Sequence, residues 1–176
     1  FKADGIGADI NEYLNNTTFF ASYAQSETDP SLASSAVINP ANGMTDGGML
    51  GSTNSETGHS TWIGVQAPCL LSEGAKIGLE WNKGSQYWRS VTYAEDTIVG
   101  SKIATRGTAI EAYWLKPLTR SLSMSIRHTQ IKYDYTGSNA FFGADGTPMT
   151  MAQAKMYGQN PVEEATDTRI AISYKF

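Results

Sequence analysis

Strict alternation of apolar and polar residues along several segments constrains the fold of this chain more than any other feature. In the last ten residues, every second side chain from Ile170 to Phe176 is apolar or aromatic. Successive side chains of a β-strand point to opposite faces of a sheet, so this period predicts strands with one apolar and one polar face. The pattern predicts six strands, over residues 17–25, 61–69, 75–82, 109–114, 122–127 and 167–176.

The segments between these strands fall into two length classes. Residues 70–74 and 117–120 are short enough for tight turns, whereas residues 26–60, 84–105 and 136–165 are long and rich in Gly, Ser, Thr and Asn. Loops of that length are uncommon in compact soluble domains. Short turns at one end and long loops at the other are typical of an up-and-down barrel of a bacterial outer membrane. We therefore expect an all-β, antiparallel transmembrane β-barrel fold with long extracellular loops.

The amino-acid composition argues against several other classes of protein. Only 17% of the 176 residues are charged, against about 25% in soluble proteins. No apolar run approaches the roughly 18 residues of a transmembrane helix, which excludes a helical membrane protein. A net charge of -4 with scattered Lys and Arg argues against nucleic acid as a partner, because phosphate neutralisation needs clustered cations. The outer-membrane lipid is the expected partner of the apolar faces.

A soluble antiparallel sandwich is the competing interpretation, since its strands alternate in the same way. The long loops and the low charge disfavour it. So does the polar face, where small residues such as Gly78, Ala109 and Ser123 replace the Lys and Glu typical of a surface in bulk water.

Six strands cannot close a membrane barrel, since the smallest bacterial barrels have eight and an open edge in lipid leaves backbone groups unpaired. We therefore expect residues 1–176 to be the C-terminal portion of one barrel domain, closed by missing N-terminal strands or by other protomers. The alternative is an extra hairpin over residues 87–93 and 97–104, which would give eight strands. A short helix is expected inside the last long loop, over residues 149–157.

The C-terminal segment Arg169–Phe176 (RIAISYKF) resembles the terminal targeting strand of Gram-negative outer-membrane barrels. The resemblance implies that the barrel-assembly machinery recognises this strand, that Phe176 is a true terminus facing the periplasm, and that the protein is in the cell outer membrane. The residues that match the pattern are Ile170, Ile172, Tyr174 and Phe176.

Four internal segments carry a second, looser resemblance, to an uncharacterised family of porin-like outer-membrane proteins from epsilon-class Proteobacteria. They are Gly78–Asn82 (GLEWN), Tyr87–Ser90 (YWRS), Ala104–Gly107 (ATRG) and Tyr133–Ser138 (YDYTGS). Members of that family are longer than this chain, which again implies a C-terminal portion. No activity and no functional residue comes with the resemblance.

The charged residues on the polar faces are the candidate site, because they would line a water-filled lumen. Facing acids and bases across a pore orient water and select solutes by charge. Salt bridges that only stabilise the wall are an equally good interpretation. The candidates are Lys76, Glu80, Glu111, Arg127, Asp167, Arg169 and Lys175.

Aromatic residues near the strand ends would form interfacial girdles. Beyond Gln130 the apolar phase shifts to Ile131, Tyr133 and Tyr135, which predicts a bulge or a strand that leaves the membrane. The girdle candidates are Trp81, Trp114, Tyr133, Tyr174 and Phe176.

No catalytic, metal or cofactor site is expected. His59 and His128 are far apart in the expected topology, His59 in a loop and His128 near a strand end, and Cys69 is the only cysteine. Our leading hypothesis is a porin-like channel for passive passage of small hydrophilic solutes, with acidic loops such as residues 26–60 disfavouring anions. The alternatives are a plugged structural or surface-binding barrel that acts through its loops and, less favoured, an enzyme at the loop rim.

Overall fold

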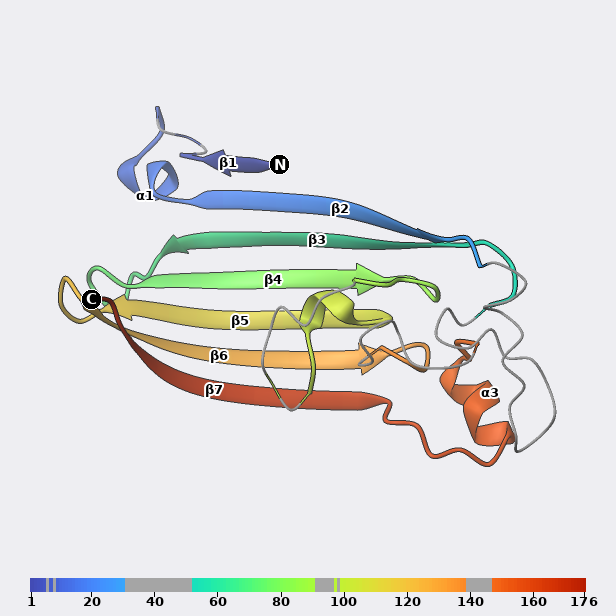
Figure 1. Ribbon diagram of the computed structural model, residues 1–176. Helices are drawn as coiled ribbons and strands as arrows, with labels where there is room; N and C mark the ends of the chain where they lie inside the picture. Colours follow the sequence, from blue (N-terminus) through green and yellow to red (C-terminus); the bar gives the residue numbers. More distant parts are fainter. Residues whose placement is uncertain (6, 8, 31–51, 91–96, 98, 139–146) are drawn as a thin grey trace.

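The computed structural model describes the chain except residues 6, 8, 31–51, 91–96, 98 and 139–146. Seven strands and three short helices make up the described part (Figure 1). The helices are α1 (Glu12–Asn15), η2 (Lys102–Ala104) and α3 (Met151–Met156). The strands are β1 (Lys2–Asp4), β2 (Thr18–Thr28), β3 (Glu56–Pro68), β4 (Lys76–Gly84), β5 (Gly107–Pro117), β6 (Leu122–Tyr133) and β7 (Glu164–Tyr174).

The strands form one sheet in the order of the sequence, β1 to β7. Each strand pairs antiparallel with the next, so the all-β, up-and-down architecture is confirmed. Within the described residues β1 pairs with β2 alone and β7 with β6 alone, so the sheet is open at both edges. The predicted count of six strands omitted β1, because its three residues are too few to display an alternation.

The two classes of connection are confirmed. Residues 69–75 and 118–121 link strands at the end of the sheet where α1 and the C-terminus also lie (Figure 1). The long connections, residues 29–55, 85–106 and 134–163, all join strand ends at the other end of the sheet. Strands β2 and β3 extend further into the first long connection than predicted, and His59 belongs to β3 rather than to a loop. Backbone pairing continues there although the side chains are mostly polar.

Two smaller predictions have opposite outcomes. The helix expected over residues 149–157 is α3, which begins with a capping box between Thr150 and Gln153. The extra hairpin is wrong for the residues that the structure describes. Residues 87–90 are outside any strand, and Lys102–Ala104 is a 3-10 turn. The remainder of the proposed hairpin, residues 91–96 and 98, lies outside the described part of the chain.

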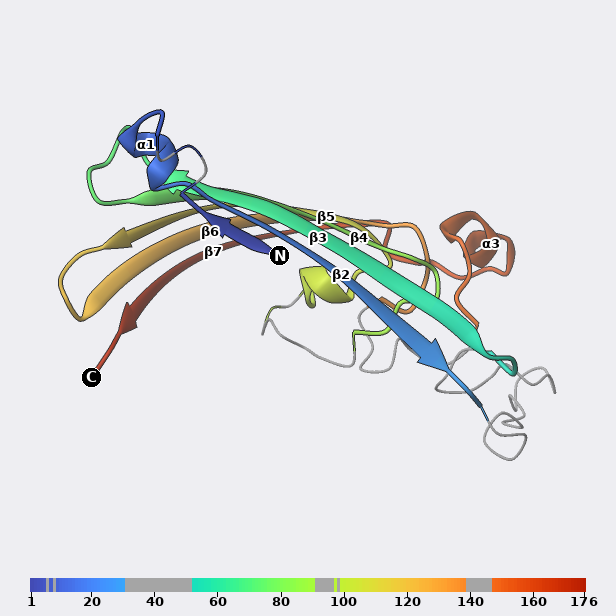
Figure 2. The same cartoon turned by 90° about the horizontal axis from the view of Figure 1, so that it is seen from above.

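Strand register separates the side chains into two faces. The sheet is curved, and η2 lies on its concave side (Figure 2). The charged side chains that contact η2 therefore mark the concave face, and the apolar residues of the alternation lie on the convex face. Convex partners in β4 to β7 include Ile77, Trp114, Ile126 and Ile170. The corresponding concave row is Glu80, Glu111, Thr129 and Asp167.

A small apolar core lies on the concave face near the long connections. Buried Ala109, Ile131 and Tyr133 pack there, with Val99 and Met151 among the residues against them. This core explains the shift of apolar phase beyond Gln130. The bulge prediction is wrong, because β6 pairs without interruption with both neighbours. The apolar residues change faces because loop residues cover the concave face at this point.

Tyr133 is consequently a core residue and not a member of an interfacial girdle. Its side chain is buried, and its hydroxyl donates a hydrogen bond to the Val99 carbonyl oxygen at 3.0 Å. None of the described helices has the length and apolar character that crossing a membrane requires.

Candidate functional site

Two carboxylates face each other at the centre of the concave face. Glu80 on β4 and Glu111 on β5 are Cα partners in the register. Like charges directly opposite each other in a sheet are destabilising. Both residues are nevertheless buried, Glu80 at 7% and Glu111 at 1% relative exposure. A cation therefore has to compensate them.

Lys102 supplies that cation from the 3-10 turn η2. Its Nζ lies 2.6 Å from Glu80 Oε2 and 2.7 Å from Glu111 Oε1. Burial alone would lower the pKa of Lys102, but its hydrogen bonds to Glu111 and Glu80 outweigh burial and raise the pKa above the ordinary value. The lysine is thus held as a charged bridge between a loop and two strands.

Further cations surround Glu111. Arg127 on β6 donates through Nη1 to Glu111 Oε1 at 2.6 Å, and Thr129 donates its hydroxyl to Oε2 at 2.8 Å. Arg169 on β7 places Nη2 3.7 Å from Oε2 and pairs through Nε with Asp167 at 2.6 Å. We call these side chains the concave cluster: Glu80, Lys102, Glu111, Arg127, Asp167 and Arg169.

Five of the seven residues predicted as the candidate site belong to the concave cluster. The other two, Lys76 and Lys175, are exposed and lie at the turn end of the sheet, where β4 begins and just after β7 ends. The alternation identified residues of one face correctly, but it did not indicate how far along the strand each residue lies from η2.

The residues matched to a targeting strand lie on β7 and just beyond it. Ile170 and Ile172 are both 67% exposed on the convex face. The rings of Tyr174 and Phe176 meet edge to face, with centroids 5.3 Å apart. The segment therefore presents apolar and aromatic side chains at an edge strand that has a neighbour on one side only among the described residues.

Sequence reasoning missed Lys102, because loop residues follow no period that would assign them to a face. Two strand glycines, Gly58 and Gly84, could have indicated that loop backbone lies close to the sheet. A Cβ at Gly84 would overlap the Thr105 carbonyl oxygen, and one at Gly58 would overlap the Tyr87 carbonyl. Glycine inside a strand often marks a close approach of another backbone. These two positions show where residues of the β4–β5 connection cross the sheet.

Buried hydrogen bonds fasten the β4–β5 connection to its surroundings. Trp88 Nε1 donates to the Ile103 carbonyl at 2.7 Å. Arg106 donates through Nε to the Trp88 carbonyl at 3.1 Å and through Nη1 to the Thr136 carbonyl at 3.0 Å. Burial and the nearby Arg89 lower the pKa of Arg106 to about 10. Together with the ion pairs of Lys102, these bonds tie the described residues of this connection to the sheet and to the β6–β7 connection.

A cavity of about 520 Å³ separates η2 from the concave face of β2 and β3. Trp62 and Trp88 line it together with Glu80, Lys102 and Arg127. Trp62 Nε1 donates to Glu80 Oε2 at 3.1 Å. The concave cluster therefore borders a space of the size that small molecules occupy.

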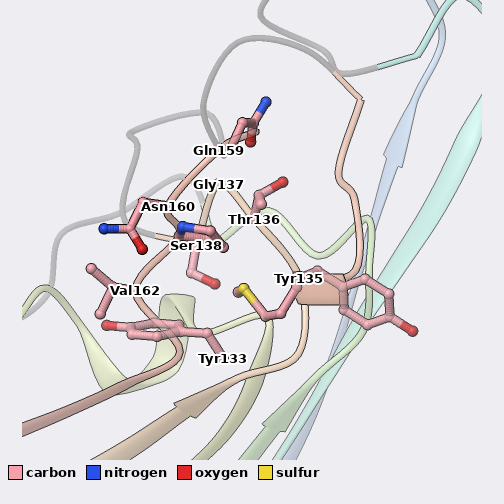
Figure 3. A pocket seen from close by; sticks show the side chains of 10 residues that line it. Tyr133, Tyr135, Thr136, Gly137, Ser138, Gln159, Asn160 and Val162 are labelled. Carbon is pink, nitrogen blue, oxygen red and sulfur yellow. The ribbon is translucent and has the colours of Figure 1, made fainter. Parts of the chain in front are cut away.

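A second cavity, of about 370 Å³, lies between the end of β6 and residues 159–162 (Figure 3). Its lining is uncharged, and several of its polar groups already fasten the loops. Ser138 Oγ accepts a hydrogen bond from the Arg106 backbone, and Thr136 Oγ1 accepts one from the Met149 backbone. We therefore place the candidate site at the concave cluster.

No group of three or more metal-ligating side chains occurs among the residues that the structure describes. The two histidines are on different strands. His128 Nδ1 lies 2.8 Å from Thr168 Oγ1, and the His59 ring stacks on Tyr23 with centroids 6.2 Å apart.

Comparison with known proteins gives a family match over the whole chain. The family is described as "Protein of unknown function (DUF3373)", and it matches residues 1–176. Neither a curated protein nor a solved structure matches the sequence. The chain therefore belongs to the DUF3373 family of proteins of unknown function.

Proposed function

We propose that this chain is part of the wall of an outer-membrane β-barrel that lets small hydrophilic solutes cross passively. The observation that carries the proposal is the opposite character of the two faces of one sheet. The convex face exposes large apolar side chains, and the concave face holds the charged cluster. A wall between lipid and a water-filled lumen requires this arrangement.

The exposed convex face is the first support. Leu79 is 52%, Ile110 45% and Ile170 67% exposed, and they belong to three different strands. Contiguous apolar surface of this kind is unfavourable in water and marks contact with a partner or a membrane. Strands β5 and β7 have 11 residues each, and a tilted strand of that length spans roughly 28 Å, close to the apolar band of an outer membrane.

The open edges at β1 and β7 are the second support. Unpaired backbone groups in lipid cost several kcal/mol each, so only a closed barrel is stable there. Further strands or other protomers would complete the barrel, and the terminal segment from Ile170 to Phe176 would present it to the assembly machinery. Figure 1 shows the short turns at one end of the sheet and, at the opposite end, the strand ends that the long connections join.

The docked turn η2 gives the lumen a narrow point in this proposal. Lys102 holds the turn against the two glutamates of the concave cluster, and Arg106, the residue before β5, donates to the Trp88 and Thr136 carbonyls. Solutes would pass along the remaining space beside the cluster, where side-chain charge acts on them at short range.

The docking of η2 on the concave cluster also favours a second candidate function, a plugged barrel that acts through its extracellular loops. A plug has to be fixed to the barrel wall, and the described residues of the β4–β5 connection are fixed to the sheet through Lys102. Closed bilayer recordings, combined with loss of ligand or cell binding on deletion of residues 31–51, would favour this candidate over the channel.

Planar-bilayer recording of the purified full-length protein tests the proposal. We expect discrete conductance steps that are absent from a heat-denatured sample of the same preparation. Absence of conductance from protein that resists extraction without detergent and shows a heat-dependent gel shift would reject the channel but keep the membrane barrel. Extraction without detergent and no gel shift would reject both.

A further inference from the structure

We infer that the concave cluster gives the channel a preference for anions, the substrate class being small carboxylate- or phosphate-like solutes and inorganic anions. The inference rests on the proposed function, because it assumes that solutes pass along the concave face. The cluster has three acids and three bases. Their number therefore does not decide which sign of charge a solute meets on the concave face.

Two arginines lie side by side in this cluster. Arg127 on β6 and Arg169 on β7 are Cα partners in the register, on the same face. Directly opposed like charges destabilise a sheet. The shared carboxylate of Glu111 offsets this repulsion only in part, since it also binds Lys102. The pair is therefore an arrangement that packing alone does not favour, and an additional anion would stabilise it.

Burial divides the acids from the arginines. The side chain of Glu111 is 0% exposed, that of Glu80 8% and that of Asp167 18%. The side chains of Arg127 and Arg169 are 33% and 32% exposed. Lys102, the cation that neutralises the two buried glutamates, is itself only 8% exposed. A solute on the concave face therefore meets guanidinium groups first.

The guanidinium groups are also held in place. Arg127 lies over the Tyr113 ring, with its Cζ 4.9 Å from the ring centroid, while Nη1 is fixed on Glu111. Arg169 Nε forms an ion pair with Asp167 Oδ2 at 2.6 Å. An arginine offers several N–H donors in a planar fork that suits carboxylate and phosphate oxygens, and it is more weakly hydrated than lysine. Preorganised donors of this kind therefore favour anions that carry carboxylate or phosphate oxygens.

This preference is opposite to the bias expected from the acidic first loop. Of its acids, Glu27 and Glu56 lie at the loop ends of β2 and β3, and Asp29 follows β2. Exposed charges act over about 8 Å at physiological ionic strength. Side chains that border the narrow point therefore decide selectivity, and the loop acids act on the entrance.

The test is the zero-current potential of the full-length protein in a planar bilayer under a tenfold KCl gradient. The wild-type protein should pass chloride in preference to potassium. The double variant R127Q/R169Q should lower the chloride-to-potassium permeability ratio by about fivefold or more, the effect of one unit charge at 4 Å in water. Citrate, a small carboxylate anion, should block wild type more strongly than this variant.

The matched control is K76Q/K175Q, which removes two exposed cations of the same sheet away from the cluster. It should leave the permeability ratio within twofold of wild type. The variant R127K/R169K keeps both charges and should keep the sign of the preference, which separates charge loss from misfolding. Should the double glutamine variant fail to insert, the single variants R127Q and R169Q each have to lower the ratio.

Failure of the inference is distinguishable from failure of the proposed function. Absence of any wild-type conductance contradicts the channel itself. A conducting wild type that prefers potassium overturns the inference alone. So does a preference for chloride that R127Q/R169Q leaves unchanged, or that K76Q/K175Q lowers equally.

Discussion

Replacing Lys102 with Met should release the β4–β5 connection from the concave face. Removing one partner of a buried ion pair typically costs about 3–5 kcal/mol, because the other charge stays buried without compensation. Glu111 keeps its bonds to Arg127 and Thr129, whereas Glu80 keeps, among the described residues, the single bond from Trp62. The lower end, about 3 kcal/mol, therefore applies. It corresponds to an increase of about 10²-fold in the ratio of released to docked turn.

Hydrogen exchange of the full-length protein in detergent measures that ratio. The Ala104 amide donates to the Ser101 carbonyl at 3.1 Å inside the docked turn, so its protection reports docking. We expect its exchange to accelerate by about 10²-fold in K102M. The double variant K102M/E80Q should recover part of the protection, because a neutral glutamine costs less to bury than an orphaned carboxylate.

The control is K83M, which removes a comparable ion pair at the surface. Lys83 pairs with Asp134, and these side chains are 44% and 36% exposed. Such pairs contribute about 0–1 kcal/mol, so Ala104 exchange should change by less than about fivefold. Equal effects of K102M and K83M on Ala104 exchange would show that the buried ion pairs of Lys102 do not hold this turn against the sheet.

Three further outcomes are expected. The variant L79R, on the convex face, should destabilise the folded barrel by roughly 2–4 kcal/mol, the cost of an Arg against lipid, and so lower the folded fraction seen in heat-modifiability gels. The variant S125R, on the concave face, should leave that fraction unchanged. The variant G78A should destabilise the protein by about 1–3 kcal/mol in thermal unfolding, because the new Cβ would overlap the Tyr113 ring, and equal stability of G78A and wild type would contradict the packing. Because the docked state raises the pKa of Lys102, docking is favoured below the ordinary lysine pKa and lost only as pH rises through the raised one. Ala104 protection, corrected for intrinsic exchange, should therefore hold from pH 7 to about pH 10, and a loss near pH 8 would contradict this sign.

Much of the sheet was predictable because period-two alternation directly encodes which residues share a face. Glu80 and Glu111 were assigned to one face without knowledge of the register, and the separation of turns from long connections followed from composition. The short helix expected over residues 149–157 is α3, and the structure adds its Thr150 cap.

The failures come from contacts between segments distant in sequence. Lys102 had no periodic neighbours, and its burial depends on Glu80, which lies 22 positions earlier. Ile131 and Tyr133 followed a changed phase because loop residues such as Val99 cover them. A local pattern records which face a side chain takes, but not what covers that face.

In the proposed barrel, the convex face of the sheet meets lipid and the concave face meets water. Spin labels placed one at a time along β6, at residues 123–126 and 128 in full-length protein with Cys69 replaced by Ser, test this arrangement in liposomes. Collision with oxygen should be high at 124, 126 and 128, and collision with a water-soluble nickel chelate should be high at 123 and 125. Equal access of the nickel chelate to both sets would contradict the account.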